Sequence, residues 1–405
     1  MPTVVTHKRD RHMHGYLAIE PDVLDKMIEL RRQIHRLPEL SHKENATRGI
    51  IQEALISEGL ANFHPVTETG FSVDILGERN CGGRSIAIRA DMDALPIQEQ
   101  TRLPFRSEID GVMHACGHDT HSAMAFAAAA HLNRNRAAFS GLVRILFQHS
   151  EEDLPSGAKQ FLDAGRLDDC DAVLGIHVDP ELPAGKIAVR AGTYACSSDH
   201  FDIAVAGRSC HGGKPHQGVD AIGAACSLVC ELTKIRSHNT SPLVPLVVTV
   251  GMVSGGTAPN IISDRALIRG TIRAGDEEVR KVAHKRVTEL ANGVALMHGA
   301  SCTIAIMEDA PVLINDAGMA ELVQRTAREI GGQAALEDAP MWTASDDFAY
   351  LSADRPGVYF RLGVRNAAKN CDHPLHHPLF SVDEDALSIG AAVLARAAET
   401  YLLTE

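Results

Sequence analysis

A short segment concentrates side chains that bind metals, and it runs Met113-His114-Ala115-Cys116-Gly117-His118-Asp119. Because only Gly117 separates Cys116 from His118, an extended turn can direct the thiol and the imidazole toward one ion. A lone buried cysteine is more often a small apolar residue than a ligand. The neighbouring imidazoles and the carboxylate of Asp119 favour a metal-binding role for Cys116.

A metal site also needs ligands from elsewhere, and candidates recur downstream. Glu151 and Glu152 follow a predicted strand, and consecutive side chains leaving a strand point in opposite directions. One carboxylate can therefore bind metal while the other stays free as a general base. His177 follows another predicted strand, although a lone histidine there is more often a core residue.

A third source of ligands is the C-terminal cluster His373, His376 and His377. The surrounding prolines exclude a helix, so this segment is predicted to be a loop that can reach the other candidates.

Strand and helix patterns alternate in the part of the chain that carries these residues. The predicted strands cover residues 71–76, 85–88, 142–147 and 172–176. Helices separate them, including an Ala-rich helix at about residues 120–133. This order predicts an α/β fold with a mostly parallel sheet flanked by helices. Asp91, Glu151 with Glu152, and His177 each come just past a different strand, and ligands bind at that rim of such sheets.

The rhythm then changes to a β-α-β-β-α-β order over residues 200–307, which predicts a ferredoxin-like unit. The sheet-and-helix pattern resumes afterwards with a helix at 315–330, a strand at 357–362 and a helix at 383–402. We therefore expect a discontinuous catalytic domain of residues 21–193 and 310–405 and an inserted lid of residues 194–309. Residues 1–20 are expected to form an N-terminal extension in which His7, His12 and His14 are incidental.

Composition limits the function classes. A net charge of −13 over 405 residues argues against nucleic-acid and anionic-membrane partners. Nine cysteines, an odd number, with no apolar leader segment favour a reduced cytoplasm over a secreted disulfide framework. No apolar run suggests a membrane span. Gly82-Gly83 and Gly255-Gly256 form no phosphate-binding fingerprint.

In these residues and their order, the chain resembles the aminoacylase and carboxypeptidase family of metal-dependent amidohydrolases. It is most similar to the branch with hippurate hydrolases and plant hydrolases of indole-acetyl amino acids. The resemblance covers about residues 24–402, and its main blocks are Arg89-Ala90-Asp91-Met92-Asp93-Ala94-Leu95-Pro96, Met113 to His118, Glu151-Glu152, Gly175-Ile176-His177, Gly270-Thr271-Ile272-Arg273 and Leu375-His376.

The resemblance implies a zinc-peptidase-like catalytic domain with two divalent ions per subunit, manganese or zinc first and nickel or cobalt as alternatives. The implied ligands are Cys116, His118, Glu152, His177 and His376. Glu151 would be the general base, and Asp91 would orient a ligand. The implied reaction is hydrolysis of an N-acyl amino acid or a small dipeptide.

The resemblance also assigns roles in the lid. His211 would reach the site of a partner subunit and polarise the scissile carbonyl, which implies a homodimer formed through the lid. Asn260 and Arg273 would hold the carboxylate of the substrate.

The chain departs from the family pattern at His149-Ser150, at Ser209-Cys210 and at Ser345-Asp346-Asp347-Phe348, which carries aspartate where glutamate is usual. His149 is a further candidate ligand, for which packing is the more common role. Two other classes stay open. One is a thiol hydrolase that uses Cys116, and the other is a non-catalytic metal-binding protein.

Overall fold

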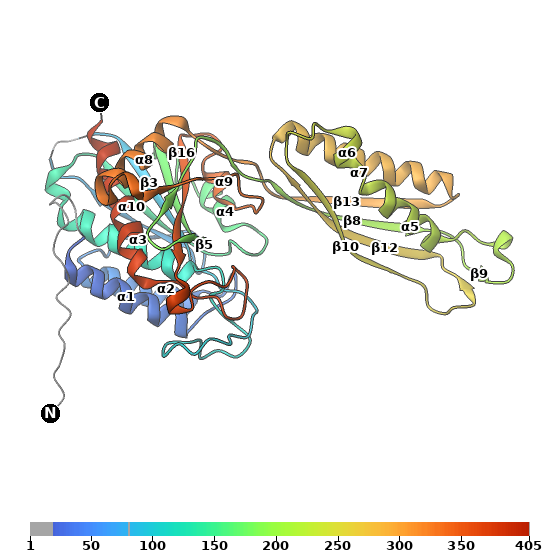
Figure 1. Ribbon diagram of the computed structural model, residues 1–405, viewed down its shortest axis with the longest axis horizontal. Helices are drawn as coiled ribbons and strands as arrows, with labels where there is room; N and C mark the ends of the chain where they lie inside the picture. Colours follow the sequence, from blue (N-terminus) through green and yellow to red (C-terminus); the bar gives the residue numbers. More distant parts are fainter. Residues whose placement is uncertain (1–18, 80–81, 405) are drawn as a thin grey trace.

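The computed structural model describes residues 19–79 and 82–404. His7, His12 and His14 of the predicted N-terminal extension lie outside the described residues. Figure 1 shows a larger body that carries the C-terminus and a smaller body joined to it by extended strands.

The larger body is built on an eight-stranded sheet. Its strands, in spatial order, are β1 (Phe63–Pro65), β2 (Phe71–Leu76), β4 (Leu142–Gln148), β3 (Ser85–Asp91), β5 (Ala172–Pro183), β16 (Gly357–Arg365), β6 (Ile187–Ala188) and β15 (Leu336–Glu337). The central strands β4, β3, β5 and β16 run parallel. Antiparallel pairs are β1 with β2, β2 with β4, and β6 with β16, and β15 runs parallel to β6. The predicted α/β class with a mostly parallel sheet is confirmed.

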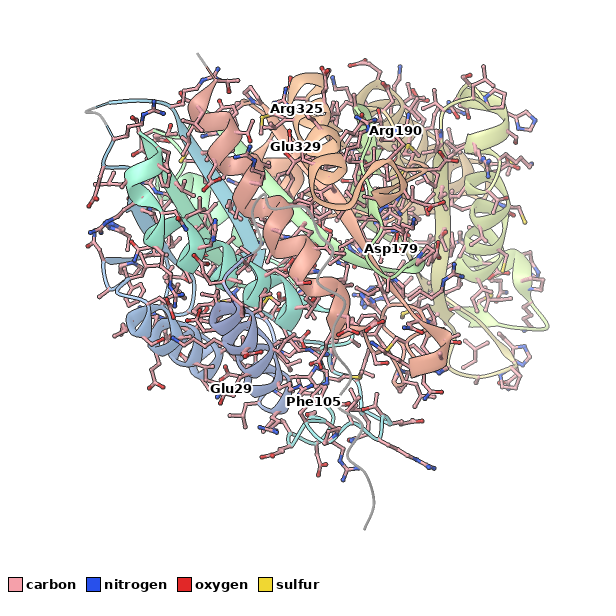
Figure 2. The ribbon with its side chains drawn as sticks, turned by 60° about the vertical axis from the view of Figure 1, so that its left-hand side comes forward. Glu29, Phe105, Asp179, Arg190, Arg325 and Glu329 are labelled. Atoms are coloured by element: carbon pink, nitrogen blue, oxygen red, sulfur yellow. The ribbon has the colours of Figure 1, made fainter. Side chains whose placement is uncertain are left out.

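Helices pack on both faces of this sheet because successive side chains of a strand point to opposite sides. Leu174 of β5 belongs to one apolar core and Val173 to another. The first core includes α1 (Pro21–Arg36), α2 (Asn45–Ser57), α3 (His118–Arg134), α8 (Ala317–Gly331) and α10 (Leu387–Leu403). The second includes α4 (Gly157–Asp163) and α9 (Phe348–Leu351). Figure 2 shows the first layer, with Glu29 of α1 and Arg325 and Glu329 of α8 among its exposed residues.

The smaller body has its own sheet and its own apolar core. Its four antiparallel strands lie in the order β10 (Leu246–Gly255), β12 (Arg265–Ala274), β8 (Ser198–Ala206) and β13 (Ser301–Ala310). Helices α5 (Ala221–Leu232), α6 (Ile235–Asn239) and α7 (Glu277–Met297) share that core. In place of the single helix predicted at 220–236, the structure has the two helices α5 and α6, which are separated at residues 233–234.

Short elements complete the chain. A two-stranded sheet of β9 (Cys210–His211) and β11 (Ile261–Ile262) lies at the end of the smaller body, and β7 (Gly192–Ala195) pairs with β14 (Leu313–Asn315). The 3-10 turns are η1 (Arg136–Ala138), η2 (Pro215–Gln217), η3 (Gln333–Ala335), η4 (Ala367–Lys369) and η5 (Glu384–Ala386).

Strand β5 is longer than predicted and contains His177, so the expectation that His177 follows the strand was wrong. The pairing of β5 with β3 ends at Gly175, but its pairing with β16 continues through Pro183. His177 therefore lies past the last β3–β5 pair, level with Asp91 at the carboxyl end of β3, while still within a strand.

One helix, residues 384–403, has the length and hydropathy of a membrane span, which the sequence had not been expected to contain. About 72% of its apolar window is buried inside the fold. Its α10 part packs against α3, α8 and β3, as expected of a core helix.

Candidate metal centre

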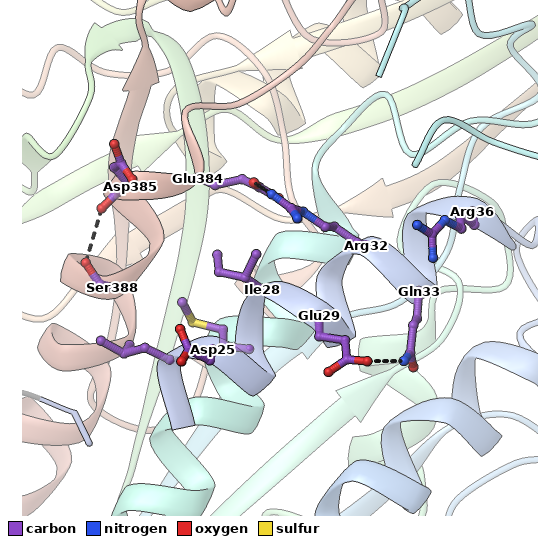
Figure 3. Close-up of a pocket in the computed structure, with 11 residues that line it drawn as sticks. Asp25, Ile28, Glu29, Arg32, Gln33, Arg36, Glu384, Asp385 and Ser388 are labelled. Carbon is purple, nitrogen blue, oxygen red and sulfur yellow. Dashed lines mark hydrogen bonds and ion pairs between the residues drawn. The ribbon is translucent and has the colours of Figure 1, made fainter. Parts of the chain in front are cut away.

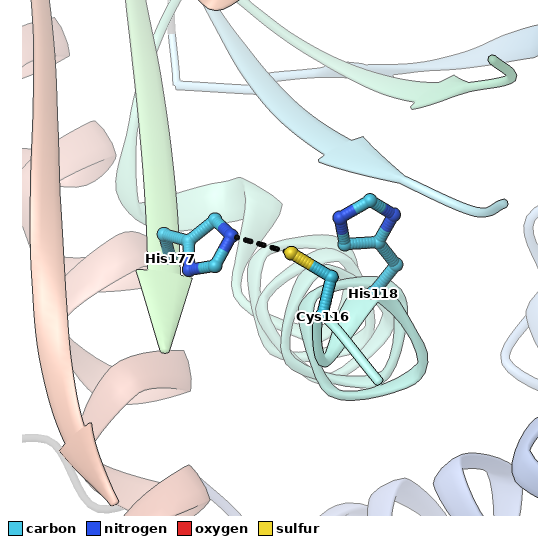
Figure 4. Close-up of side chains that lie close together, drawn as sticks. All are labelled: Cys116, His118 and His177. Atoms are coloured by element: carbon cyan, nitrogen blue, oxygen red, sulfur yellow. Dashed lines mark hydrogen bonds between the residues drawn. The ribbon is translucent and has the colours of Figure 1, made fainter. Parts of the chain in front are cut away.

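Gly117 places Cys116 and His118 at the start of α3. Its φ is 87°, and a Cβ atom there would lie 2.4 Å from Cγ2 of Val178. Only glycine adopts this conformation in this space without strain. The turn leaves the Cys116 thiol and the His118 imidazole near His177 (Figure 4).

The structure brings the five predicted ligands together. Sγ of Cys116 lies 3.4 Å from Nε2 of His177. Oε1 of Glu152 lies 3.9 Å from Nε2 of His118 and 3.3 Å from Nε2 of His376. Two sets have ligand atoms within 4.8 Å of one another, and Cys116 belongs to both: Cys116, His118 and His177, and Cys116, Glu152 and His376.

The orientation of the two buried imidazoles fits a pair of cations. Nδ1 of His118 lies 3.1 Å from Oδ1 of Asp93, and Nδ1 of His177 lies 2.6 Å from the carbonyl oxygen of Val178. A carbonyl oxygen and an ionised carboxylate can only accept, so both Nδ1 atoms donate. Once the imidazoles are neutral, both Nε2 atoms have lone pairs for a cation.

Two atoms of the cluster are buried without a hydrogen-bond partner, Nε2 of His118 and Oε1 of Glu152. Burying such atoms unpaired is unfavourable, and a cation would satisfy both. Thiolate, imidazole and carboxylate ligands together suit borderline divalent ions. The residues present therefore fit the predicted metals.

The electrostatics of the cluster oppose a free thiolate. Burial raises the pKa of the Cys116 thiol well above its usual value, and the carboxylates of Glu152 and Glu151 raise it further. Burial lowers the pKa of His118, but Asp91 and Asp93 outweigh burial and raise it to about 10. A thiol hydrolase needs a depressed thiol pKa, so this environment disfavours that alternative.

Glu151 and Glu152 diverge, as expected for adjacent residues. Both backbone N–H groups donate to Oδ2 of Asp93, at 3.0 and 2.9 Å. The Glu152 carboxylate faces His376, whereas Glu151 groups with Asp346 and Asp347. Both carboxylates lie within 4.0 Å of Nε2 of His118. Burial and then the charge of Asp346 raise the pKa of Glu151 well above its usual value.

Asp93, which is absent from the predicted site, makes the contact with His118. Asp91 instead accepts from Arg89 Nη1 at 2.6 Å and from His121 Nδ1 at 2.6 Å. Nε2 of His121 in turn accepts from the backbone N–H of Val178 at 3.0 Å. Asp91, which was predicted to orient a ligand, thus contacts Arg89 and His121, and its Oδ2 lies 3.8 Å from Nε2 of His118. Asp93 follows Asp91 by two residues in the block Asp91-Met92-Asp93, and this second aspartate could have marked it as a site residue.

Arg89 links this layer to the carboxylates beside Glu151. Its guanidinium lies 2.6 Å from Asp91, 2.7 Å from Asp347 and 3.3 Å from Asp346. Burial raises the pKa of Asp347, to about 7, although Arg89 opposes that shift.

The structure separates the three predicted lid residues. Arg273 lines the same cavity of about 340 Å³ as Cys116, Glu151 and His376, and its Nη1 donates to Ser198 Oγ at 2.5 Å. His211 and Asn260 do not line it. They lie next to each other, because the N–H of Gly212 donates to the carbonyl of Asn260 at 2.7 Å.

Both of these residues are exposed, and Figure 1 places β9 at the end of the smaller body farthest from the large sheet. The eight-residue step along β12 from Arg265, near that end, to Arg273 spans about 26 Å. Within one chain, His211 and Asn260 therefore cannot reach the cation ligands.

His149 packs instead of joining the ligands. Its ring lies 5.8 Å from that of His42 and 6.2 Å from that of Phe161. Among residues 19–79 and 82–404 it belongs to none of the clusters that could hold a metal.

A second hollow, of about 840 Å³, lies between α1 and the start of α10 (Figure 3). Its lining includes Arg32, which pairs with Glu384 at 3.0 Å, and no histidine or cysteine. Four of the five predicted cation ligands, Cys116, Glu152, His177 and His376, instead line the cavity that Arg273 also lines.

Comparison with known proteins agrees with this geometry. The chain matches Peptidase family M20/M25/M40 over residues 87–400. It is 37% identical over 381 residues to the N-acetylcysteine deacetylase of Bacillus subtilis, covering 94% of this chain and 97% of that one. It is 36% identical over 392 residues to the IAA-amino acid hydrolase ILR1-like 2 of Arabidopsis thaliana, covering 95% and 87%.

A solved structure is also similar, that of the Bacillus subtilis YXEP protein, described as a dinuclear metal binding peptidase. It superposes with a TM-score of 0.83 at 34% identity, covering 95% of this chain and 100% of that one. Fold and site define a metal-dependent amidohydrolase. The chain belongs to Peptidase family M20/M25/M40, and the resemblance to the aminoacylase and carboxypeptidase family is confirmed.

Proposed function

We propose that the protein hydrolyses the amide bond of N-acyl amino acids and releases a carboxylic acid and an amino acid. The observation that carries this proposal is the arrangement of the two glutamates beside His118: Glu152 also faces His376, whereas Glu151 also groups with Asp346 and Asp347 and is the carboxylate that we assign to proton transfer. The names of the two relatives support it, because each describes an enzyme that acts on an amino acid with an acyl group on its nitrogen. A small dipeptide is the second candidate substrate.

We assign Cys116, His118, Glu152, His177 and His376 as the ligands of two divalent ions. The unpartnered buried atoms of His118 and Glu152 support the assignment. Manganese or zinc would be the first choice, with nickel or cobalt as alternatives, since mixed sulfur, nitrogen and oxygen ligands suit all four.

Bound cations would polarise the scissile carbonyl and make a water molecule more acidic. The chain's own residues then move the proton. Glu151 accepts it from the attacking water and passes it to the departing amine nitrogen. Arg273 offers its guanidinium to the carboxylate of the amino acid.

We further propose that residues 194–309 act as lid and dimerisation unit of a homodimer. His211 and Asn260 are exposed and remote from their own cavity, so they would serve the site of the partner subunit. There His211 would stabilise the oxyanion. Exposed apolar side chains on the edge strand β10, among them Met252 and Val253, support an interface on this unit.

A cytoplasmic location stays an expectation. It is supported by the cysteines among the described residues, which are all free.

The test is hydrolysis of acetyl, benzoyl and indole-acetyl amino acids and of dipeptides by chelated protein to which each metal is added back. Metal-dependent release of the free amino acid from the N-acyl substrates is expected. Cleavage confined to dipeptides, or activity that survives chelation, would contradict the proposal.

A further inference from the structure

Four apolar residues, Ala310, Trp342, Ala344 and Leu375, form part of the wall of the cavity at the metal centre, beside the polar Ser198, His200 and Arg273. None of the four is a proposed ligand. Trp342 is the only tryptophan of the chain. Its side chain is the largest of the four.

Backbone hydrogen bonds hold Trp342 in the wall. Its N–H donates to the carbonyl of Tyr194 at 2.7 Å, and its own carbonyl accepts from the N–H of Cys196 at 3.1 Å. The position of the indole is therefore tied to the chain that connects the two bodies.

The indole is also packed from the protein side. The guanidinium of Arg361 lies over the ring at 5.6 Å. That guanidinium is held by Asp179 at 2.8 Å and by the Tyr194 hydroxyl at 3.1 Å. Arg361 is buried, so it packs against the indole from the interior of the protein.

Trp342 also contacts a proposed ligand directly. Its ring centroid lies 5.1 Å from that of His177, with an angle of 70° between the ring planes. The acyl substituent is bonded directly to the scissile carbonyl carbon, so it must lie beside the ligands. The amino-acid carboxylate is farther from that carbon and is directed toward Arg273.

From this arrangement we propose that Trp342 forms the acyl subsite and selects planar aromatic acyl groups, of the benzoyl type, over acetyl. The inference rests on the proposed function for the identity of the reaction. Aromatic rings pack favourably against one another beyond the area that they bury, whereas an acetyl group offers only a methyl to the indole.

A direct test uses the single tryptophan as the reporter. Benzoate and acetate are titrated into the metal-loaded protein while the tryptophan emission is recorded. Benzoate is expected to change the emission saturably, and acetate at the same concentration is expected to leave it unchanged. An emission that does not respond to benzoate, or that responds equally to both, would overturn the subsite.

A kinetic test compares N-benzoylglycine with N-acetylglycine, which differ only in the acyl group. Trp342→Ala should lower the ratio of their kcat/KM values roughly tenfold, and Trp342→Phe should lower it less. Leu296→Ala, at a side chain that is 81% exposed on α7, is the matched control and should leave the ratio unchanged.

An equal loss on both substrates in Trp342→Ala would show a structural role and overturn the proposal, as would an unchanged ratio. If the unmodified protein hydrolysed neither substrate, the proposed function would fail, and the emission titration would still decide whether Trp342 binds the aromatic acid.

Discussion

Asp93 holds His118 from behind the metal centre, with Oδ1 of the carboxylate 3.1 Å from Nδ1 of the imidazole. The other oxygen of Asp93 accepts the backbone N–H groups of Glu151 and Glu152 and the hydroxyl of Ser41. One buried carboxylate thus fixes a proposed ligand and the turn that carries the proposed base.

Replacing Asp93 should weaken metal binding. In Asp93→Asn, His118 loses a charged acceptor, and affinity for the cations should fall by about 10- to 100-fold. Metal titration of chelated protein measures the change. Asp153→Asn, an exposed aspartate on the same loop, is the control and should bind as the unmodified protein does. Equal affinities in the two variants would show that Asp93 does not support the centre.

Removing the thiol should disrupt both cation positions, since Cys116 belongs to both sets of ligand atoms. Cys116→Ala is expected to retain fewer than two ions per chain after gel filtration. Cys170→Ala removes another buried thiol and should keep both. Elemental analysis that finds two ions in Cys116→Ala would remove Cys116 from the ligand set.

Metal binding should release protons and should weaken as the pH falls. In the metal-free protein the pKa of His118 is raised to about 10, and burial raises the pKa of Cys116 well above its usual value. Both groups therefore keep their protons at neutral pH, and a cation must displace them. Calorimetry in buffers of different ionisation enthalpy counts these protons. Affinity that does not change between about pH 6 and pH 8 would argue against this ligand set.

The local pattern of the chain was enough to predict the strand at 71–76 and the β-α-β-β-α-β order of the smaller body. Its hydrophobic periodicity reports which face of an element is buried. The length of β5 was not predictable in this way, because its last residues are held by pairing with β16, whose sequence lies far along the chain.

In the candidate site, too, some features follow from local sequence and others from tertiary structure. Cys116, His118 and the pair Glu151-Glu152 were predictable as candidates from their types and spacing, and the structure brings them together. The choice of Glu152 as the ligand came from the family resemblance. The contact of Glu151 with Asp346 joins segments almost 200 residues apart, so only tertiary structure places them side by side. The separation of His211 from Arg273 likewise depends on the direction of β12, which no motif encodes.

The proposed homodimer predicts that two inactive variants complement each other. In a mixed dimer of His211→Ala and Glu151→Gln subunits, one site has an intact Glu151 and receives an intact His211 from its partner. Equal mixing makes half of the dimers mixed, each with one of two sites working, so about a quarter of the unmodified activity should return. Unfolding and refolding the mixture before the assay allows the subunits to exchange. If His211 acted within its own chain, mixing would restore nothing.

The central claim is that residues from separate segments hold two cations while Glu151 stays unligated beside them. Glu151→Gln tests it most directly, with metal content and turnover measured on the same preparation. The variant should bind two divalent ions per chain, as the unmodified protein does, and lose roughly 10²- to 10⁴-fold in kcat. Near-normal turnover, or loss of bound metal along with activity, would contradict the assignment of Glu151 as the free base.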